Sequence, residues 1–343
     1  MAMPLSLYRR QELAFRTQYA ELKERSASVG TLLPGTPGRL VLRTGTGYRY
    51  WYRSYYAVPG QPTEDFVCKD SDESALAGAT QAIAFADWAA RQVRDLRKLE
   101  FQVADKAAAR VLVELHNRGL FDGGLVVVGT LAFMAWLNEL GAKAVVARTQ
   151  DIDLARRQAL KLAAPVSFLD TVKATKLRFS PVPGLAPDVS PTSVKLAGAE
   201  GLRIDVLAEG RSLGRVVEIP ELAWHAQSIP HLDFLLSESR WAALLAGGSC
   251  VPVRLPAPER FLLHKLYSSV SRTAFPEKAR KDLMQAATMA AVLVEDDGAD
   301  LAAALDDAPS AVRSAARSRL PALRGLLANH AQAIDEIERA LSP

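Results

Sequence analysis

Three aspartates interrupt apolar runs of this 343-residue chain, at positions where strands are expected. Asp151 and Asp153 flank Ile152 in the segment TQDIDLA. Asp205 lies in the segment GLRIDVL. In an extended strand, Asp151 and Asp153 point to one face and Ile152 points to the other. Carboxylates that share a face repel each other unless a cation lies between them, and carboxylate oxygens are preferred ligands of hard divalent ions. The three aspartates are therefore candidate ligands of a hard divalent cation.

A second candidate feature is the Gly129-Thr130 pair, which follows the apolar run VVV and precedes a helical pattern. A turn that opens a helix presents backbone N–H groups and the positive end of the helix dipole, which suits a phosphate group. Glycine lets the phosphate approach the backbone closely. Gly129 and Thr130 are therefore candidate nucleotide-binding residues.

Each of these features also has an ordinary structural explanation. A Gly-Thr pair is most often only a turn, an Asp-x-Asp segment is usually solvated loop surface, and a single aspartate can cap the end of an apolar strand. Their order is more specific: a strand, Gly129-Thr130 and a helix, then Asp151 and Asp153, then Asp205 on a later strand. In this order the chain resembles the nucleotidyltransferase superfamily of the polymerase-β type.

The region after the aspartates extends the resemblance, which covers about residues 120–295. Residues 256–294 are similar to the helical region of minimal bacterial nucleotidyltransferases, which include the toxins of type IV toxin–antitoxin systems and related proteins of unknown substrate. The shared pattern is a lysine, then basic residues, then a Lys-Asp pair that opens the next helix. The matching residues here are Lys265, Arg272, Lys281 and Asp282. The resemblance implies that the cations hold nucleotide phosphates. A helix surface with ordinary ion pairs is the alternative explanation.

The resemblance also implies a reaction. A nucleoside monophosphate would move from an NTP, such as ATP, to an acceptor hydroxyl with release of pyrophosphate. Mg²⁺ or Mn²⁺ at Asp151, Asp153 and Asp205 would stabilise the developing charge, and Asp205 would help to deprotonate the acceptor. RNA, a protein or a small molecule is the implied acceptor, and an antitoxin or another regulatory protein is the implied partner.

The N-terminal region has an excess of positive charge. Residues 1–60 carry nine basic and three acidic residues, a net charge of +6, whereas the whole chain has a formal charge of +4. Aromatic and basic residues alternate in the segment YRYWYRSYY, residues 48–56. Aromatic rings stack on bases and basic residues contact phosphates, so this region is a candidate RNA-binding surface. An aromatic core face of a β-sheet and a solvated helix face are the alternative explanations.

Composition excludes several protein classes. With 49% hydrophobic and 23% charged residues, the chain differs from disordered, collagen-like and disulfide-rich proteins. Cys68 and Cys250 lie far apart and form no zinc-binding motif, which favours a reducing, cytoplasmic compartment. The longest uncharged stretch, residues 123–138, is too short to span a membrane, and no secretory signal is visible at the N-terminus.

The apolar patterns predict an α+β fold. We expect a central nucleotidyltransferase-fold mixed sheet with flanking helices, an N-terminal helix with a small β-module, and a C-terminal helical bundle that closes over the nucleotide. Helices are predicted at residues 5–26, 74–119, 131–140 and beyond 256, a small antiparallel sheet at 38–70, and one strand from 144 whose end carries the acidic pair. The expected domains are an N-terminal module at 1–120, a catalytic domain at 121–255 and a C-terminal helical domain at 256–343.

Two other functions remain open. A glycosyltransferase also uses an Asp-x-Asp motif to bind a metal and a nucleotide diphosphate. Such a fold does not need a Gly-Thr turn upstream and a third aspartate downstream in this order. A non-catalytic nucleotide- or RNA-binding module is the other alternative, and the presence of all three aspartates argues against it. His264, beside Lys265, is expected on a helix surface.

Overall fold

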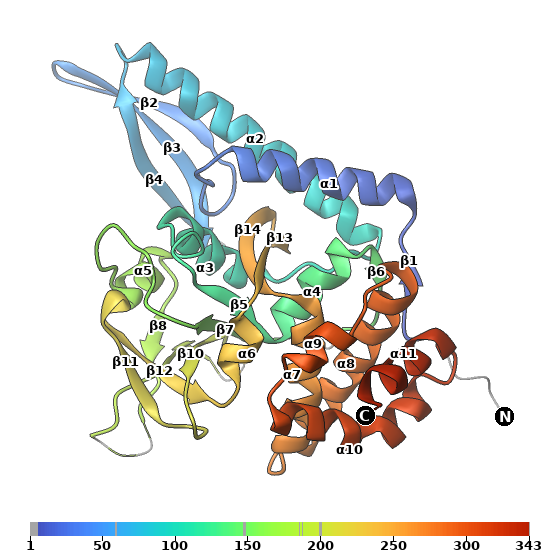
Figure 1. Cartoon of the computed structure of the whole chain (residues 1–343). Helices are drawn as coiled ribbons and strands as arrows, with labels where there is room; N and C mark the ends of the chain where they lie inside the picture. Colours follow the sequence, from blue (N-terminus) through green and yellow to red (C-terminus); the bar gives the residue numbers. More distant parts are fainter. Residues whose placement is uncertain are drawn as a thin grey trace.

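The computed structural model describes residues 6–342, apart from residues 59, 147–148, 185, 187 and 199–200. Figure 1 shows an N-terminal pair of long helices with an outlying sheet, a central sheet, and a group of C-terminal helices. The predicted α+β fold, with a mixed sheet and flanking helices, is confirmed. In the part of the chain that is described, no helix is both long and apolar enough to cross a membrane.

A mixed sheet forms the centre of the molecule. Its main path runs β11-β12-β10-β7-β5, and β8 and β9 extend it beside β10. β7 and β12 are parallel to β10, whereas β5 is antiparallel to β7. The strands of the path are β5 (Val126–Val128), β7 (Asp151–Arg156), β10 (Arg203–Glu209), β11 (Val216–Ile219) and β12 (Trp224–Ile229), and the two others are β8 (Phe179–Pro181) and β9 (Ser193–Leu196).

The predicted alternation of side chains is confirmed in β7 and β10. Ile152 and Ile204 are fully buried, whereas the residues on either side of them, Asp151 and Asp153 in β7 and Arg203 and Asp205 in β10, are partly exposed. One correction concerns the position of the acidic pair, because Asp151 and Asp153 lie at the start of β7 and not at the end of a longer strand. Pairing with β10 begins at Asp151, and residues 144–146 belong to no strand. Ala147, the last residue of the expected first part of this strand, lies outside the described residues.

The N-terminal region contains α1 (Leu13–Ser28), α2 (Glu73–Lys98) and α3 (Lys106–Asn117). The predicted helix at 5–26 begins too early, because β1 (Arg9–Arg10) pairs with β6 (Ala142–Lys143) and holds the backbone extended before α1. Residue 5 lies outside the described residues. The small sheet is confirmed as an antiparallel order of β2 (Arg39–Gly45), β3 (Tyr48–Val58) and β4 (Gln61–Lys69).

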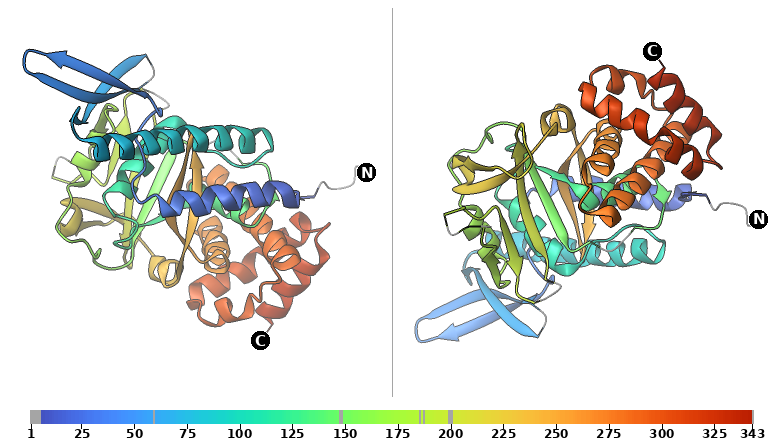
Figure 2. Two further views of the ribbon diagram at one scale, coloured as in Figure 1. Left: turned by 90° about the horizontal axis from the view of Figure 1, so that it is seen from above. Right: turned by 90° about the horizontal axis from the view of Figure 1, so that it is seen from below.

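The rest of the chain is mostly helical, as predicted beyond residue 256. A β-hairpin of β13 (Ser239–Ala246) and β14 (Ser249–Pro256) leads into these helices. The C-terminal helices are α7 (Pro258–Ser271), α8 (Pro276–Asp296), α9 (Ala302–Asp306), α10 (Ser310–Leu326) and α11 (Ala331–Leu341). Short elements complete the middle of the chain: α5 (Phe168–Ala174), η1 (Pro220–Leu222) and α6 (Leu232–Leu236). The two views in Figure 2 show the C-terminal helices grouped beside the central sheet, at one side of the molecule.

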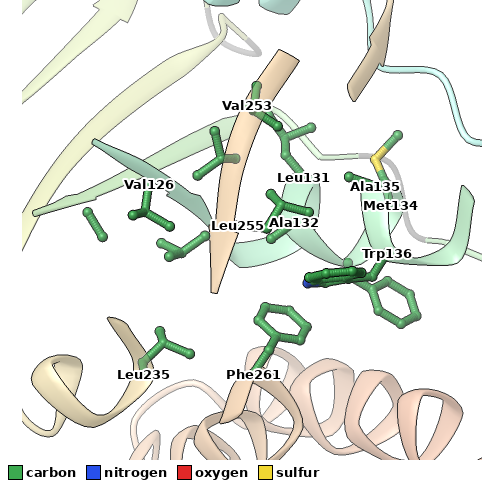
Figure 3. Packing of buried hydrophobic residues seen from close by; sticks show 14 of the residues in the cluster. Val126, Leu131, Ala132, Met134, Ala135, Trp136, Leu235, Val253, Leu255 and Phe261 are labelled. Carbon is green, nitrogen blue, oxygen red and sulfur yellow. The ribbon is translucent and has the colours of Figure 1, made fainter. Parts of the chain in front are cut away.

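Helix α4 (Gly129–Glu139) connects the central sheet to the C-terminal helices. It is buried along most of its length, and Trp136 donates a hydrogen bond of 3.1 Å to the backbone oxygen of Pro256. Figure 3 shows Leu255 and Phe261 in the same packed layer as α4. One cluster of buried apolar residues runs from the strands through α4 into α7 and α8. Packing therefore holds the start of α4 in a constant position relative to both the sheet and the C-terminal helices.

Candidate active site

The structure brings the three predicted aspartates to adjacent positions of the central sheet. In the parallel pair of β7 and β10, Asp153 is the direct neighbour of Asp205, and Asp151 is the neighbour of Arg203. Along β7 and β10, partly exposed residues alternate with buried ones. Asp151, Asp153 and Asp205 are all partly exposed, so their side chains lie on the same face of the sheet. Strand pairing therefore joins two motifs that lie far apart in the sequence.

Asp153 is the most perturbed carboxyl of this group. Burial and the neighbouring charges of Asp205 and Asp151 raise its pKa to about 6, while Lys265 and Arg272 act in the opposite direction. A nearby cation stabilises the ionised form of such a carboxyl, because opposite charges attract. The site therefore has an excess of negative charge at Asp153, next to several cations.

Gly129 provides the space for the Asp153 carboxylate. A Cβ atom at Gly129 would lie 1.9 Å from Oδ2 of Asp153, and the φ angle of Gly129 is +67°. No other residue type combines that backbone conformation with so close a neighbour. The sequence suggested this glycine as a place for a phosphate to approach. The structure gives a second reason for a glycine at this position, because only a residue without a Cβ leaves room for the Asp153 carboxylate beside the first turn of α4.

Thr130 is joined to the C-terminal helices through Lys281. The Nζ of Lys281 donates a hydrogen bond of 3.2 Å to Oγ1 of Thr130, from α8 to the start of α4. Burial and the nearby Lys265 lower the pKa of Lys281, while the charges of Asp282 and Asp153 counteract them. An ammonium group therefore stands at the N-terminus of α4, where the helix dipole already favours an anion.

Lys265 and Arg272 surround one buried carboxylate. The Nζ of Lys265 lies 2.7 Å from Oδ1 of Asp282, and Nη1 of Arg272 lies 3.3 Å from Oδ2. The Asp282 side chain is fully buried, whereas Arg272 is 42% exposed. Lys281 and Asp282 do not open α8, which begins at Pro276 with a proline at its first position. The cations are thus pre-arranged by Asp282, and the sequence alone did not indicate its burial.

The buried ion pair leads to a prediction about stability. Replacing Lys265 by Met leaves Asp282 buried with only Arg272 as a charged partner, so we expect the free energy of unfolding in urea to fall by about 3–5 kcal/mol. Replacing Asp282 by Leu in the same variant should recover most of this loss, because an apolar pair needs no compensating charge.

The control for this prediction is Arg324→Met, which removes an exposed ion pair with Glu338 and should cost less than about 1 kcal/mol. Equal stability of Lys265→Met and the unaltered protein would contradict a structural role for the Lys265–Asp282 pair.

Arg203 is a site residue that the sequence analysis missed. Its Nε lies 2.8 Å from Oδ1 of Asp205, and its Nη2 donates a hydrogen bond of 2.7 Å to Oγ of Ser193. Alternation could have identified it, because Arg203 and Asp205 are two residues apart on one strand and therefore share a face.

The donor chemistry of the site fits a hard divalent cation, since three carboxylates lie at neighbouring backbone positions and repel one another. As the side chains stand, no group of three or more His, Cys, Asp and Glu residues among those described is arranged to hold a metal ion. Arg203 is hydrogen-bonded to Asp205, so a metal ion would have to displace its guanidinium from this carboxylate.

His264 lies in the interior and not on a helix surface, contrary to the prediction. It is 9% exposed, and burial together with the charge of Lys265 lowers its pKa to about 4. Its Nε2 has no hydrogen-bond partner among the described residues. His264 is therefore neutral at pH 7. Its burial follows from the packing of α7 against α8 and α6, which single-helix periodicity does not reveal.

The N-terminal positive charge is largely neutralised within the fold. Arg53 donates hydrogen bonds to backbone oxygens of the 34–37 loop. Six of the other basic residues pair with carboxylates, mostly from later parts of the chain: Arg9 with Glu100, Arg10 with Asp296, Lys23 with Glu139, Arg25 with Glu21, Arg43 with Glu64 and Arg49 with Asp70. The net charge of this region is therefore a weaker indication of RNA binding than the sequence suggested.

Aromatic rings remain exposed on the outlying sheet. We define the aromatic surface as Tyr48, Tyr50, Tyr52 and Phe66. The rings of Tyr48 and Tyr50 stack at 5.1 Å between centroids, and Phe66 meets Tyr50 and Tyr52 edge-on at 5.8 Å. Phe66 is 59% exposed. The core-facing side of β3 carries Arg53 and Tyr55 instead, so the aromatic surface is not the core face of this sheet.

Comparison with known proteins identifies one family. A family model described as "Nucleotidyltransferase" matches residues 106–310, more than half of the chain and the whole of the candidate site. A nucleotidyltransferase-like antigenic protein of Paracoccidioides brasiliensis matches with 15% sequence identity and a TM-score of 0.38, over 67% of this chain and 92% of that protein. No curated protein matches this chain.

Proposed function

Because the chain belongs to this nucleotidyltransferase family, we propose that it transfers a nucleoside monophosphate from an NTP to an acceptor hydroxyl. The acceptor oxygen forms a bond to the α-phosphorus, the bond between that phosphorus and the bridging oxygen breaks, and pyrophosphate leaves. The observation that carries the proposal is the contact of the Asp153 carboxylate with Gly129 at the start of α4. It puts an acidic cluster beside a turn suited to phosphate, with Lys281 on Thr130.

The chain's own residues divide between phosphate binding and proton removal. Thr130 and the backbone N–H groups at the start of α4 would hold the triphosphate. Lys281, Lys265 and Arg272 would neutralise the charge of the departing pyrophosphate. Arg272 is the most exposed of the three and can leave Asp282 for a phosphate, because Lys265 remains paired with that carboxylate.

The three aspartates would act at the reacting centre. Asp205 would accept the proton of the acceptor hydroxyl, since a carboxylate within reach of an alcohol acts as a general base. Mg²⁺ or Mn²⁺ held by Asp151, Asp153 and Asp205 would supply positive charge to the transferring phosphoryl group.

RNA is the acceptor that the aromatic surface favours. Stacking of a base on an exposed ring contributes about 1–3 kcal/mol in single-stranded nucleic-acid complexes. We expect a Tyr48→Ser/Tyr50→Ser variant to raise the KM for an RNA acceptor by about tenfold or more, with the KM for NTP unchanged. Leu213→Ser is the control, because Leu213 is 66% exposed and lies outside the aromatic surface. An unchanged KM for RNA would show that the aromatic surface does not bind the acceptor.

The function is tested by incubating the protein with each α-³²P-labelled NTP, Mg²⁺ or Mn²⁺, and either total RNA or total cell protein. Label on RNA supports the proposal in full, and label on protein supports the reaction with a different acceptor. A glycosyltransferase would instead transfer labelled sugar from a sugar nucleotide. Nucleotide binding without transfer to any acceptor would identify the non-catalytic alternative.

Lys281 allows a test of nucleotide binding alone. We expect Lys281→Met to raise the KM for NTP by about tenfold or more, because charge-assisted hydrogen bonds to phosphate contribute about 1.5–3 kcal/mol. Lys278→Met is the matched control, since Lys278 is exposed on the same helix and lies over the Phe275 ring. A KM within twofold of that of the unaltered protein would exclude Lys281 from the nucleotide site.

The similarity to type IV toxins leads us to propose a regulatory protein partner as well. Expression in cells should then slow growth, and Asp153→Asn should relieve the effect by removing transfer without altering the surface. If growth is equally slow with Asp153→Asn, the toxicity does not depend on nucleotidyl transfer.

A further inference from the structure

A cavity of about 570 Å³ is lined by none of the residues of the candidate active site. Its walls come from α2, α3, residues 32–37 and the turn between β13 and β14. α2 contributes Ala89, Val93 and Leu96 to a second, smaller cluster of buried residues, whereas α3 belongs to the main core. The cavity therefore lies at the junction of two packed units, a common position for small-molecule sites, and its volume falls within their usual range.

The interior of the cavity is apolar and is lined by small residues. Ala86, Ala89 and Ala90 face it from α2, and Ala109 and Val113 face it from α3. The β13–β14 turn closes against these alanines, because a Cβ atom at Gly247 would lie 3.0 Å from the Cβ of Ala109. Larger side chains at the alanine positions would fill the space. The cavity therefore has space and an apolar lining for an apolar molecule.

The charged groups of the cavity are all positive. Arg94 and Arg97 from α2, and Lys106 and Arg110 from α3, belong to its lining, which contains no aspartate or glutamate. Among the described residues, Arg94, Arg97 and Lys106 form no ion pair. Other cations of α2 do so, since Arg91 pairs with Asp87 and Lys98 with Asp95. The unpaired cations of this helix are therefore those at the cavity.

Arg110, the fourth cation of the lining, is held by the protein itself. The residue is 5% exposed, and its Nε and Nη2 donate hydrogen bonds of 3.3 and 3.0 Å to the backbone oxygen of Thr175. In the part of the chain that the structure describes, its Nη1 has no hydrogen-bond partner. Because that nitrogen is fully buried and Nη2 lies 3.5 Å from Oε1 of Glu114, the cations that remain for an anion in the cavity are Arg94, Arg97 and Lys106.

We propose that this cavity binds an amphiphile that has an alkyl chain and a single anionic head, as a fatty acid has. The chain would lie among the alanines and valines, and the head would lie at Arg94, Arg97 and Lys106. The location, away from Asp153 and Gly129, makes it a site distinct from the nucleotidyl-transfer centre. A fatty acid and an anionic lysolipid share this chemistry, so the head group has to be distinguished by experiment.

The test is calorimetric titration of the full-length protein, without NTP, with dodecanoate, dodecyl phosphate, dodecanol and dodecyltrimethylammonium, each below its micellar concentration. We expect one equivalent of dodecanoate to bind, dodecanol to bind more weakly, and dodecyltrimethylammonium not to bind. Tighter binding of dodecyl phosphate than of dodecanoate would assign the site to a phosphate-headed lipid. Equal binding of the anionic and cationic amphiphiles, or binding of neither, would overturn the proposal.

Two variants localise the binding. Arg94→Gln/Arg97→Gln should weaken dodecanoate binding by about tenfold or more, whereas Arg91→Gln, on the same helix outside the cavity, should leave it within twofold. Ala86→Trp, at a partly exposed position of the wall, should abolish binding by filling the space. Thermal unfolding of each variant verifies that it is folded. Undiminished binding by both Arg94→Gln/Arg97→Gln and Ala86→Trp would show that the amphiphile binds elsewhere. Because no NTP is present, the outcome is independent of the proposed transfer reaction.

Discussion

Asp153→Asn is expected to lower the rate of nucleotidyl transfer by about 10³-fold or more while the protein remains folded. The substitution keeps the shape of the side chain next to Gly129 and removes its charge. Charge stabilisation at a transferring phosphoryl group is worth several kcal/mol, and each 1.36 kcal/mol corresponds to about a tenfold change in rate. The measurement is the initial rate of label transfer at saturating NTP and metal, compared with Asp122→Asn, which changes an exposed aspartate.

The same variant should be more stable than the unaltered protein when no metal is present. The pKa of Asp153 is raised to about 6 in the folded protein, from an ordinary value of 3.8. The folded state therefore holds this proton more tightly than the unfolded state, and the free energy of unfolding falls as the pH rises from about 4 to about 6. Above this range the ionised Asp153 carboxylate lowers the free energy of unfolding by its full amount, about 1–3 kcal/mol.

Thermal unfolding in a chelator measures this effect. Near pH 7.5 the Tm of Asp153→Asn should exceed that of the unaltered protein, and the difference should disappear toward pH 4. Loss of transfer together with a higher Tm is the signature of a residue whose charge serves function at a cost in stability. Transfer within tenfold of the unaltered rate would contradict a role for Asp153 in the reaction.

Gly129→Ala is expected to remove activity and to destabilise the protein by at least about 2 kcal/mol. The new Cβ would overlap Oδ2 of Asp153, so either the carboxylate or the first turn of α4 must move. The left-handed conformation of residue 129 adds about 1–2 kcal/mol for a residue with a Cβ. Both movements displace groups that the proposed mechanism requires. Urea unfolding and the initial rate of transfer measure the two effects.

Gly119→Ala is a matched control for this variant. Gly119 has a φ angle of +69°, close to the +67° of Gly129, and a Cβ there meets no atom within 4 Å. It therefore carries the backbone strain without the overlap, and we expect a loss of about 1–2 kcal/mol with normal transfer. If the two variants lose equal stability and both remain active, the contact of Gly129 with Asp153 has no part in the site.

Several features of the site were predictable because they depend on short-range patterns. The positions of Ile152 and Ile204 in buried strands follow from alternation, which is a property of the extended backbone. The turn at Gly129 follows from a glycine between an apolar strand and a helical pattern. These local signals, in their order along the chain, were sufficient to identify the family that the comparison shows.

Other features depend on which segments meet, and local patterns contain no such information. The burial of Asp282 beneath Lys265 and Arg272 requires α7 and α8 to pack together. The neutralisation of the N-terminal cations requires carboxylates such as Glu139 and Asp296 from later elements. α1 begins later than the sequence pattern predicts, because β1 pairs with a strand more than a hundred residues away.

The sequence by itself determined the α+β class and the acidic and glycine motifs, because side-chain periodicity and residue type are local properties, and the order of these motifs carries the resemblance to the family. Only the tertiary structure decided that Asp153 stands beside Asp205 and against Gly129, since these contacts depend on the register of β7 with β10 and with β5. It also decided that an apolar cavity with unpaired cations lies between α2 and α3. Long-range pairing is set by the packing of the whole core, and a one-residue change in register would separate the aspartates.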